Sequence, residues 1–140
     1  MSMFDAFKLA GSAMQAQTQR LNTVASNLAN VDTASSSPDQ VYQSRKVVFE
    51  AVLQKAAPGK AALADDVRVK DIITDKTEPK KMYDPKHPMA DAEGYVYMPN
   101  VNAVEEMVDM LSASRSYQTN AEVMNTAKSL MLKTLNMGNQ

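Results

Sequence analysis

The chain has 140 residues, of which 44% are apolar and 22% are charged, so it can bury a core of its own as one or at most two domains. Its 15 Lys and Arg residues balance 16 Asp and Glu residues, and the net charge of -1 excludes strong electrostatic attraction to nucleic acid or to an anionic membrane. The absence of cysteine excludes disulfides and thiolate zinc sites, and a single histidine cannot form a histidine-rich metal cage. This composition predicts a soluble, helix-rich interaction protein without a cofactor.

The sequence predicts neither membrane insertion nor a cleaved signal peptide. No segment reaches the roughly 18 apolar residues that a membrane-spanning helix needs. Residues 1–17 lack the basic start and the apolar stretch of a secretory signal, because Asp5, Lys8 and Gln15 interrupt them. From composition alone, the protein is expected in the cytoplasm.

Charged residues divide the chain into three parts. Residues 1–44 carry five charged side chains, residues 45–99 carry nineteen, and residues 100–140 carry seven. The two ends are rich in Gln, Asn, Ser and Thr, whereas the middle holds most of the Lys, Asp and Pro. The expected parts are an N-terminal helix over residues 1–31, a loop with a small β-rich segment over 32–100, and a C-terminal helix over 101–140.

Apolar residues recur along the N-terminal arm with the spacing of a coiled coil. One row repeats every seven residues and a second row is offset from it by three, which gives a helix a narrow apolar seam. No proline interrupts these rows, although Gly11 costs about 1 kcal/mol relative to alanine in a helix. The rows are Phe7, Met14, Leu21 and Leu28, and Met3, Ala10, Gln17, Val24 and Val31.

The middle segment has the pattern of short strands and turns. Residues 67–70 alternate strictly between apolar and charged side chains and lead into two isoleucines, which predicts a strand over 67–73. Residues 95–98 predict another strand, whereas residues 47–53 fit either a strand or a short helix. Exposed connectors are expected at residues 35–38 and 56–60, and an extended, turn-rich loop around Pro79, Pro85 and Pro88.

The C-terminal arm carries a similar row between recognisable helix boundaries. Asn102 fits an N-cap, and Glu105 follows it by three residues as in a capping box. Acidic residues crowd the start of this arm and Lys128 and Lys133 lie near its end, which suits the helix dipole, and Gly138 provides a stop. The row consists of Val104, Met107, Leu111, Ser114, Tyr117, Ala121, Met124, Lys128, Met131 and Leu135.

Two arrangements of these long helices are open. They can close on each other as an antiparallel coiled coil within one chain, or they can pack among many copies. The methionines of the C-terminal row fit core packing better than a promiscuous groove. A solvated coiled coil carries Glu and Lys beside its seam, whereas the N-terminal helix carries amides, which are buried only against polar partners. These amides are Gln15, Gln17, Gln19, Asn22, Asn27 and Asn30.

The sequence predicts no catalytic and no metal site. His87 lies between two prolines, but no second positioned group that catalysis needs can be named, so a structural loop residue is expected. The adjacent carboxylate pairs at residues 65–66 and 105–106 point in different directions on a strand or a helix, and both are expected to be solvated. Phosphate-loop, dinucleotide and nucleophile-elbow motifs are absent, so the protein is not expected to be an enzyme.

Motifs in both arms and in the middle resemble one protein family. Residues 26–30, which read Ser-Asn-Leu-Ala-Asn, together with residues 19–22 and Thr33, resemble the N-terminal signature of bacterial flagellar rod and hook proteins. Residues 106–120 resemble the C-terminal signature of that family. Residues 83–102, which begin Tyr-Asp-Pro-Lys-His-Pro, are similar to its proximal rod members. The resemblance covers nearly the whole chain.

This resemblance implies a structural role. Family members form the axial rod of the flagellar basal body, which crosses the periplasm and transmits motor torque to the hook and filament. They leave the cytoplasm unfolded through the flagellar type III export apparatus and without a cleaved signal peptide, so the expected location moves from the cytoplasm to the basal body. The expected partners are other copies of the chain, other flagellar rod proteins and the export apparatus, with no nucleic acid and no membrane insertion.

The resemblance also implies where assembly contacts lie. The terminal helices of family members pair and pack around a central export channel, with the middle segment outside. One departure is the loop at residues 31–43, where related proteins often place glycine and this chain has none. The predicted assembly interface comprises Phe7, Met14, Leu21, Val24, Asn27, Leu28, Asn30, Val104, Met107, Leu111, Arg115, Tyr117, Asn120, Met124, Met131 and Leu135.

Two other classes of protein fit the arms. A different rod or hook-type axial protein would share both arms but is expected to lack the 83–102 segment. A cytosolic coiled-coil adaptor would bind one partner helix in its seam. A rod subunit enters the periplasmic basal body only when flagellar export works, whereas an adaptor stays soluble in either case, so cell fractionation separates these hypotheses.

Overall fold

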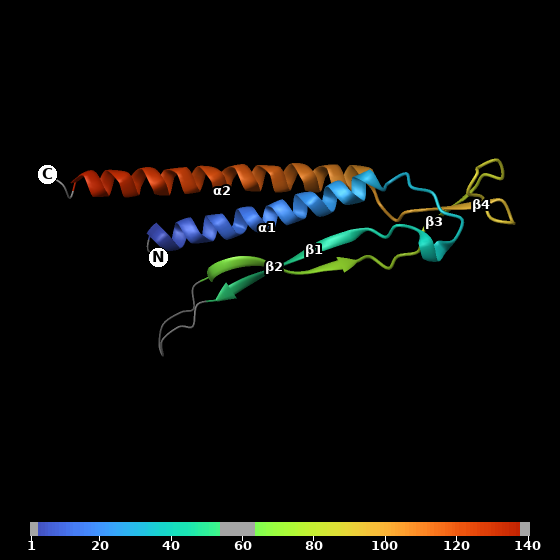
Figure 1. Cartoon of the computed structure of the whole chain (residues 1–140), viewed down its shortest axis with the longest axis horizontal. Coiled ribbons are helices and arrows are strands. Elements are labelled where there is room, and N and C mark those ends of the chain that lie inside the picture. The colour runs from blue at the N-terminus through green and yellow to red at the C-terminus, as the bar shows by residue number, and fades with distance from the viewer. Residues whose placement is uncertain (1–2, 54–63, 138–140) are drawn as a thin grey trace.

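The computed structural model describes residues 3–53 and 64–137, which are mainly helical with a small β-containing middle (Figure 1). This confirms the predicted fold class of two long terminal helices with a β segment between them. Two antiparallel sheets of two strands each make up that segment. In chain order the elements are α1 (Met3–Ala29), the 3-10 helix η1 (Pro38–Gln40), β1 (Arg45–Leu53), β2 (Ala64–Thr74), β3 (Lys80–Tyr83), β4 (Tyr95–Met98) and α2 (Ala103–Met137).

The helices α1 and α2 lie side by side and run in opposite directions (Figure 1). The end of α1 meets the start of α2, where the Nδ2 atom of Asn27 donates to the Oε1 atom of Glu106 at 2.9 Å. Farther along the pair, a Cβ atom at Gly11 would lie 3.5 Å from the Cε atom of Met124. The antiparallel pair within one chain is therefore present, and the outer faces of both helices are left for other contacts.

The start of α2 is capped as the sequence predicts. The Oδ1 atom of Asn102 accepts a hydrogen bond from the backbone N–H of Val104 at 3.2 Å, and its carbonyl accepts one from Glu106 at 3.0 Å. This arrangement satisfies an N–H group that has no partner inside the helix. The expected stop at Gly138 lies outside the described residues.

α2 contacts α1 through smaller side chains than those of the predicted row. Ala113 and Ala127 are buried, whereas Val104, Met107 and Leu111 remain 70%, 59% and 54% exposed. The first part of the predicted row therefore faces away from α1.

The difference comes from the helical period. A row that repeats every 3.5 residues turns by about 20° per heptad around a straight helix. The predicted row therefore starts on the outer side of α2 and approaches α1 only near Met124 and Met131, which are half-buried. Alanine carries little weight in a search for large apolar residues, so the contact row itself was not predicted.

β1 and β2 form an antiparallel hairpin that lies along α1 (Figure 1). The predicted strand at residues 67–73 is confirmed, and residues 47–53 form a strand and not a helix. The connector predicted at residues 56–60 lies outside the described residues. The Oγ atom of Ser12 in α1 accepts a hydrogen bond from the backbone N–H of Val67 at 3.1 Å. The small serine lets the backbone of the hairpin approach the helix directly.

β3 and β4 form a second antiparallel pair beyond the end of α1 (Figure 1). The predicted strand at residues 95–98 is confirmed, but the loop predicted around Pro79 is wrong at Lys80–Tyr83, which form β3. All four β3 side chains are exposed, so no alternation of apolar and polar residues marks this strand in the sequence. Ser35 exchanges backbone hydrogen bonds with Tyr97 at 2.9 and 3.0 Å and is buried, which corrects the prediction of an exposed connector there.

Residues 84–94 form the turn-rich connection between β3 and β4. Gly94 has a φ of +82°, in the left-handed region that favours glycine. A Cβ atom there would lie 3.0 Å from the Cε2 atom of Tyr83 and 3.1 Å from the Cβ atom of Pro85. Among the described residues no other type has a positive φ, so the glycine-free loop at residues 31–43 uses ordinary backbone angles.

The two glycines should respond oppositely to alanine. Gly94→Ala should lower the free energy of unfolding by about 1–3 kcal/mol, because it places a side chain at positive φ and against Tyr83 and Pro85. Gly11→Ala should raise it by up to about 1 kcal/mol, because alanine favours the helix and its methyl group makes ordinary contact with Met124. Urea unfolding followed by circular dichroism measures both, and equal midpoints for the two variants would contradict the assigned conformations.

Candidate assembly interface

Asn27, in the last turn of α1, is 1% exposed and joins three parts of the chain. Its Oδ1 atom accepts hydrogen bonds from the backbone N–H of Arg45 at 3.0 Å and from the hydroxyl of Tyr42 at 2.8 Å. Its Nδ2 atom donates to the carbonyl of Arg45 at 2.8 Å and to the Oε1 atom of Glu106 at 2.9 Å. An amide side chain has two donors and two acceptor lone pairs, so the full capacity of Asn27 is used.

Asn100 makes a second polar junction just before α2. Its Oδ1 atom accepts from the backbone N–H of Ser44 at 2.8 Å, and its Nδ2 atom donates to the carbonyl of Asp75 at 3.0 Å. Next to it, the ammonium group of Lys80 donates to the carbonyl of Val101 at 3.0 Å. These bonds fix the entry of β1, the exit of β2 and the approach to α2 at one end of the helix pair.

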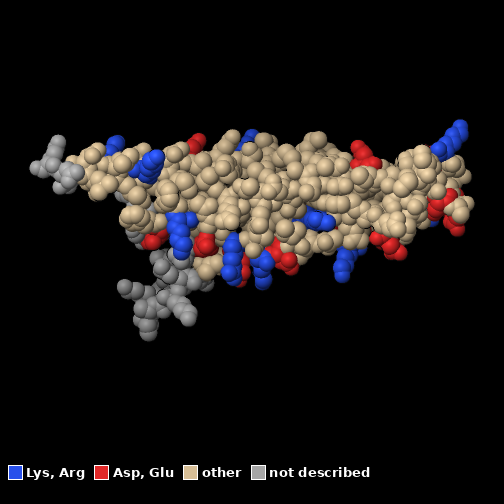
Figure 2. Space-filling view, in the orientation of Figure 1, with Lys and Arg blue, Asp and Glu red and all other residues tan. Residues whose placement is uncertain are grey.

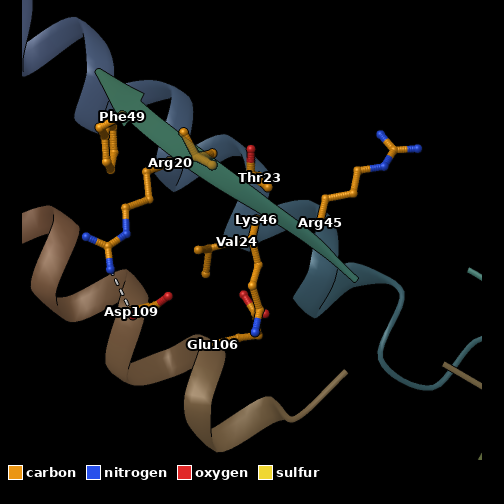
Figure 3. Close-up of a pocket in the computed structure, with 9 residues that line it drawn as sticks. Arg20, Thr23, Val24, Arg45, Lys46, Phe49, Glu106 and Asp109 are labelled. Carbon is orange, nitrogen blue, oxygen red and sulfur yellow. Dashed lines mark hydrogen bonds and ion pairs between the residues drawn. The ribbon is translucent and has the colours of Figure 1, made fainter. Parts of the chain in front are cut away.

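An open cavity of about 320 Å³ lies beside the Asn27 junction, between α1, β1 and the first turns of α2 (Figure 3). In its lining, the guanidinium group of Arg20 donates a hydrogen bond to the Oδ1 atom of Asp109 at 2.9 Å.

Over the residues that the structure describes, no group of three His, Asp or Glu side chains is placed to hold a metal ion. No helix among them is both long and apolar enough to cross a membrane.

Glu106 is 7% exposed where α2 meets α1. Burial raises the pKa of its carboxyl group, and the charges of Asp109 and Glu105 raise this pKa further. The hydrogen bond from Asn27 and the charge of Lys46 lower the pKa without offsetting the effect of burial. The folded chain therefore binds a proton at Glu106 more tightly than the unfolded chain does.

Two predictions about charged and titratable residues can be compared with this geometry. The expectation that Glu105 and Glu106 are both solvated is wrong for Glu106, because a step of one residue along a helix turns the side chain from solvent toward α1. Asp66 of the other acidic pair is half-buried. The Nδ1 atom of His87 accepts a hydrogen bond from the backbone N–H of Met89 at 3.1 Å, which places the histidine in the structure of its own loop.

The residues of the predicted assembly interface fall into three settings in a single chain. Buried are Val24 and Asn27. Half-buried are Met14, Leu21, Leu28, Asn30, Asn120, Met124 and Met131. Exposed are Phe7, Val104, Met107, Leu111, Arg115, Tyr117 and Leu135. The contacts of these side chains with other subunits stay a prediction.

Sequence reasoning missed Tyr42, Asn100 and Glu106 as anchors of the fold. Tyr42 and Asn100 lie in loops, where no periodic pattern marks a buried polar contact. A signal for Glu106 existed, because it precedes Ala113 by seven residues and so occupies the same helix face as the alanines that contact α1.

Comparison with known proteins matches both ends of the chain to family models and nearly the whole chain to relatives. Residues 7–34 match the family model described as flagella basal body rod protein, and residues 92–137 match the one described as flagellar basal body rod FlgEFG protein C-terminal. The chain is 51% identical to the flagellar basal-body rod protein FlgC of Escherichia coli O6:H1 and 50% identical to that of Salmonella typhimurium, each over 99% of both chains. The chain belongs to the FlgC family of flagellar basal-body rod proteins.

The chain is also similar to a FlgC protein of lower sequence identity. The chain is 36% identical to the flagellar basal-body rod protein FlgC of Bacillus subtilis, again over 99% of both chains. The family resemblance stated from the sequence is therefore confirmed, including its assignment to a structural class of protein and not to enzymes.

Removing the side chain of Asn27 should destabilise the fold strongly. Asn27→Ala leaves the Glu106 carboxylate, the Tyr42 hydroxyl and the Arg45 backbone without their partner, which should cost about 2–4 kcal/mol. The matched control Asn22→Ala removes an exposed amide from the same helix and should change stability by no more than about 0.5 kcal/mol. Equal urea midpoints for these two variants would contradict the role assigned to Asn27.

Glu106 should make stability fall as pH rises. Its folded pKa is raised, so protonation favours the folded state, and this contribution is lost between the ordinary glutamate pKa and the raised value. Glu106→Gln keeps an acceptor for Asn27 without a charge, so the variant should lack this loss and should be at least as stable as the parent at neutral pH. The control Glu105→Gln, at an exposed position, should still lose stability as pH rises. Unfolding midpoints measured from mildly acidic to neutral pH distinguish the two variants.

Proposed function

We propose that the chain is a structural subunit of the proximal rod of the flagellar basal body and that it assembles with other rod components through the outer faces of α1 and α2. The expected neighbours are other copies of the chain and other rod proteins. In the assembled rod, the terminal helices surround the export channel, the middle segment lies outside, and the whole forms the periplasmic drive shaft that links motor to hook. Membership of the FlgC family supports this function.

The observation that carries the proposal is the set of large apolar side chains that the helices expose in a single chain. Phe7 on α1 and Val104, Met107 and Leu111 on α2 all face solvent. Burying one such side chain stabilises an assembly by roughly 1.5–3 kcal/mol. Monomeric soluble proteins rarely expose contiguous apolar surface of this kind, so these faces fit contacts with other subunits.

The distribution of charge supports the same faces. Figure 2 shows most charged side chains along the lower side, over the β1–β2 hairpin, and at the end formed by β3 and β4, whereas the helical surface above carries few. A charge that becomes buried without a partner is strongly destabilising. Helices with few charges are therefore suited to the packed interior of a rod, and the charged middle segment is suited to its outside.

We further propose that the chain reaches the periplasm through the flagellar type III export apparatus, without a cleaved signal peptide. Membership of the FlgC family supports this route. The absence of cysteine fits passage into an oxidising compartment, because no thiol can form a wrong disulfide there.

Placing a carboxylate on the exposed face of α2 tests the assembly. Leu111→Asp should leave the single chain folded, because Leu111 faces solvent there. The variant should abolish motility and be missing from isolated basal bodies, because an unpaired charge buried between subunits costs on the order of 3–5 kcal/mol. The matched control Met89→Asp changes another exposed apolar residue, in the β3–β4 loop, and should leave motility intact.

The outcomes separate the rod subunit from a cytosolic adaptor. Motile cells that carry Leu111→Asp would show that this face stays in solvent and would contradict the assembly through it. A wild-type chain that stays in the soluble fraction of cells with a working flagellar export apparatus would contradict the rod function itself.

A further inference from the structure

The start of α2 carries an exposed apolar patch on the side away from α1. Val104, Met107, Val108 and Leu111 are each more than half exposed. Their spacing of three and four residues places them on one helix face, roughly opposite the buried Ala113. These four residues are called the head patch below.

The other end of α2 is also apolar, and it extends past α1. Because the helices are antiparallel and Gly11 lies across from Met124, the start of α1 at Met3 lies across from about residue 132. The last turns of α2 therefore continue beyond the described part of α1 (Figure 1). Leu132 and Leu135 of these last turns are exposed and three residues apart, so they share one helix face, and they are called the tail patch below.

The two ends of α2 carry opposite charges. Residues 103–112 contain three acidic residues and no basic one, whereas residues 123–137 contain two lysines and no acidic residue. Figure 2 shows blue side chains near the end of α2. The helix dipole favours these charges at each end, but it does not explain why large apolar side chains are exposed beside both.

We propose that the tail patch of one copy of the chain packs on the head patch of a second copy. The proposal rests on the assembly proposed above and specifies one of its contacts. A patch with acidic neighbours and a patch with basic neighbours complement each other in charge, and their apolar side chains bury one another. A head-to-head or tail-to-tail contact would bring like charges together.

Neighbouring side chains orient this contact. Asp109 is engaged by Arg20 within the chain, so Glu105 is the exposed acid beside the head patch that can meet an incoming lysine. Arg115 lies one turn beyond Leu111 and bounds the patch on its other side. Lys128, on the helix face of the tail patch, therefore lies toward the Glu105 end of the head patch.

The contact joins two different surfaces, which determines how assembly proceeds. After two copies join, one head patch and one tail patch remain uncovered. A heterologous contact of this kind adds further copies and does not stop at a symmetric dimer.

Engineered cysteines test the contact without background, because the chain has none. Full-length Met107→Cys and Leu135→Cys chains, both altered at exposed positions, are purified, mixed and oxidised. The 107–135 disulfide should form at least about tenfold faster than the 107–107 or 135–135 disulfide, because only the first pair is held together before oxidation. Met89→Cys mixed with Leu135→Cys provides the control for an exposed methionine outside both patches.

Charge reversal tests the orientation. Lys128 shares the face of Leu132 and Leu135, so Lys128→Glu in the tail chain should lower the yield of the 107–135 disulfide severalfold. Glu105→Lys in the head chain should restore the yield, because the exchanged charges attract again. A yield that ignores both changes overturns the assigned orientation.

The remaining outcomes decide between this contact and others. The head-to-tail contact is overturned if all cysteine pairs are oxidised at equal rates, or if a symmetric disulfide forms fastest. It is also overturned if Met107→Cys in isolated basal bodies cross-links only to a different protein. The wild-type chain found in basal bodies without the 107–135 cross-link between variants rejects this contact alone. Absence of the wild-type chain from basal bodies rejects the proposed rod function.

Discussion

The fold depends on the buried amide of Asn27, because, together with the more exposed Arg20–Asp109 ion pair, it fixes the register of the two helices. The α1–α2 contact uses small side chains such as Ala113 and Ala127, which fit almost equally well after a slide of one turn. The hydrogen bond from Asn27 to Glu106 exists at one register only, and a slide would leave both groups buried without a partner. The same amide holds the backbone of Arg45 and so positions β1 against the helix pair.

Small and polar side chains inside the helix pair leave the large apolar ones outside. In a solitary globular protein, the apolar face of a helix turns toward the core and the polar face toward water. The start of α2 does the reverse, since Glu106 faces α1 while Val104 and Met107 face solvent. At the start of α2, the hydrogen-bonded pair of Asn27 and Glu106 occupies the contact with α1, so the large apolar side chains there lie on the outer face. A subunit with this arrangement completes its apolar core only when neighbours cover it.

Local signals in the sequence were sufficient for part of this structure. The two helices, the Asn102 cap and the strands at 67–73 and 95–98 follow from periodicity and turn chemistry within each segment. The pairing of β3, the burial of Ser35 and the anchor at Asn100 depend on residues far away in the chain, so no local pattern encodes them. The helix face of α2 was mistaken because a period of 3.5 and a period of 3.6 diverge over a helix of this length.

The size of the buried side chains connects the fold with the proposed route to the rod. Among the described residues, the buried apolar side chains are alanines, valines and Pro99, and no leucine, isoleucine or phenylalanine is among them. Each contributes less hydrophobic stabilisation than a larger side chain would, so the single chain gains little from its core and relies on the polar junctions for its shape. On the proposed export route, such a chain would unfold easily for passage through a narrow channel. Under the proposed assembly, the large exposed apolar side chains would stabilise the structure only after neighbouring subunits cover them.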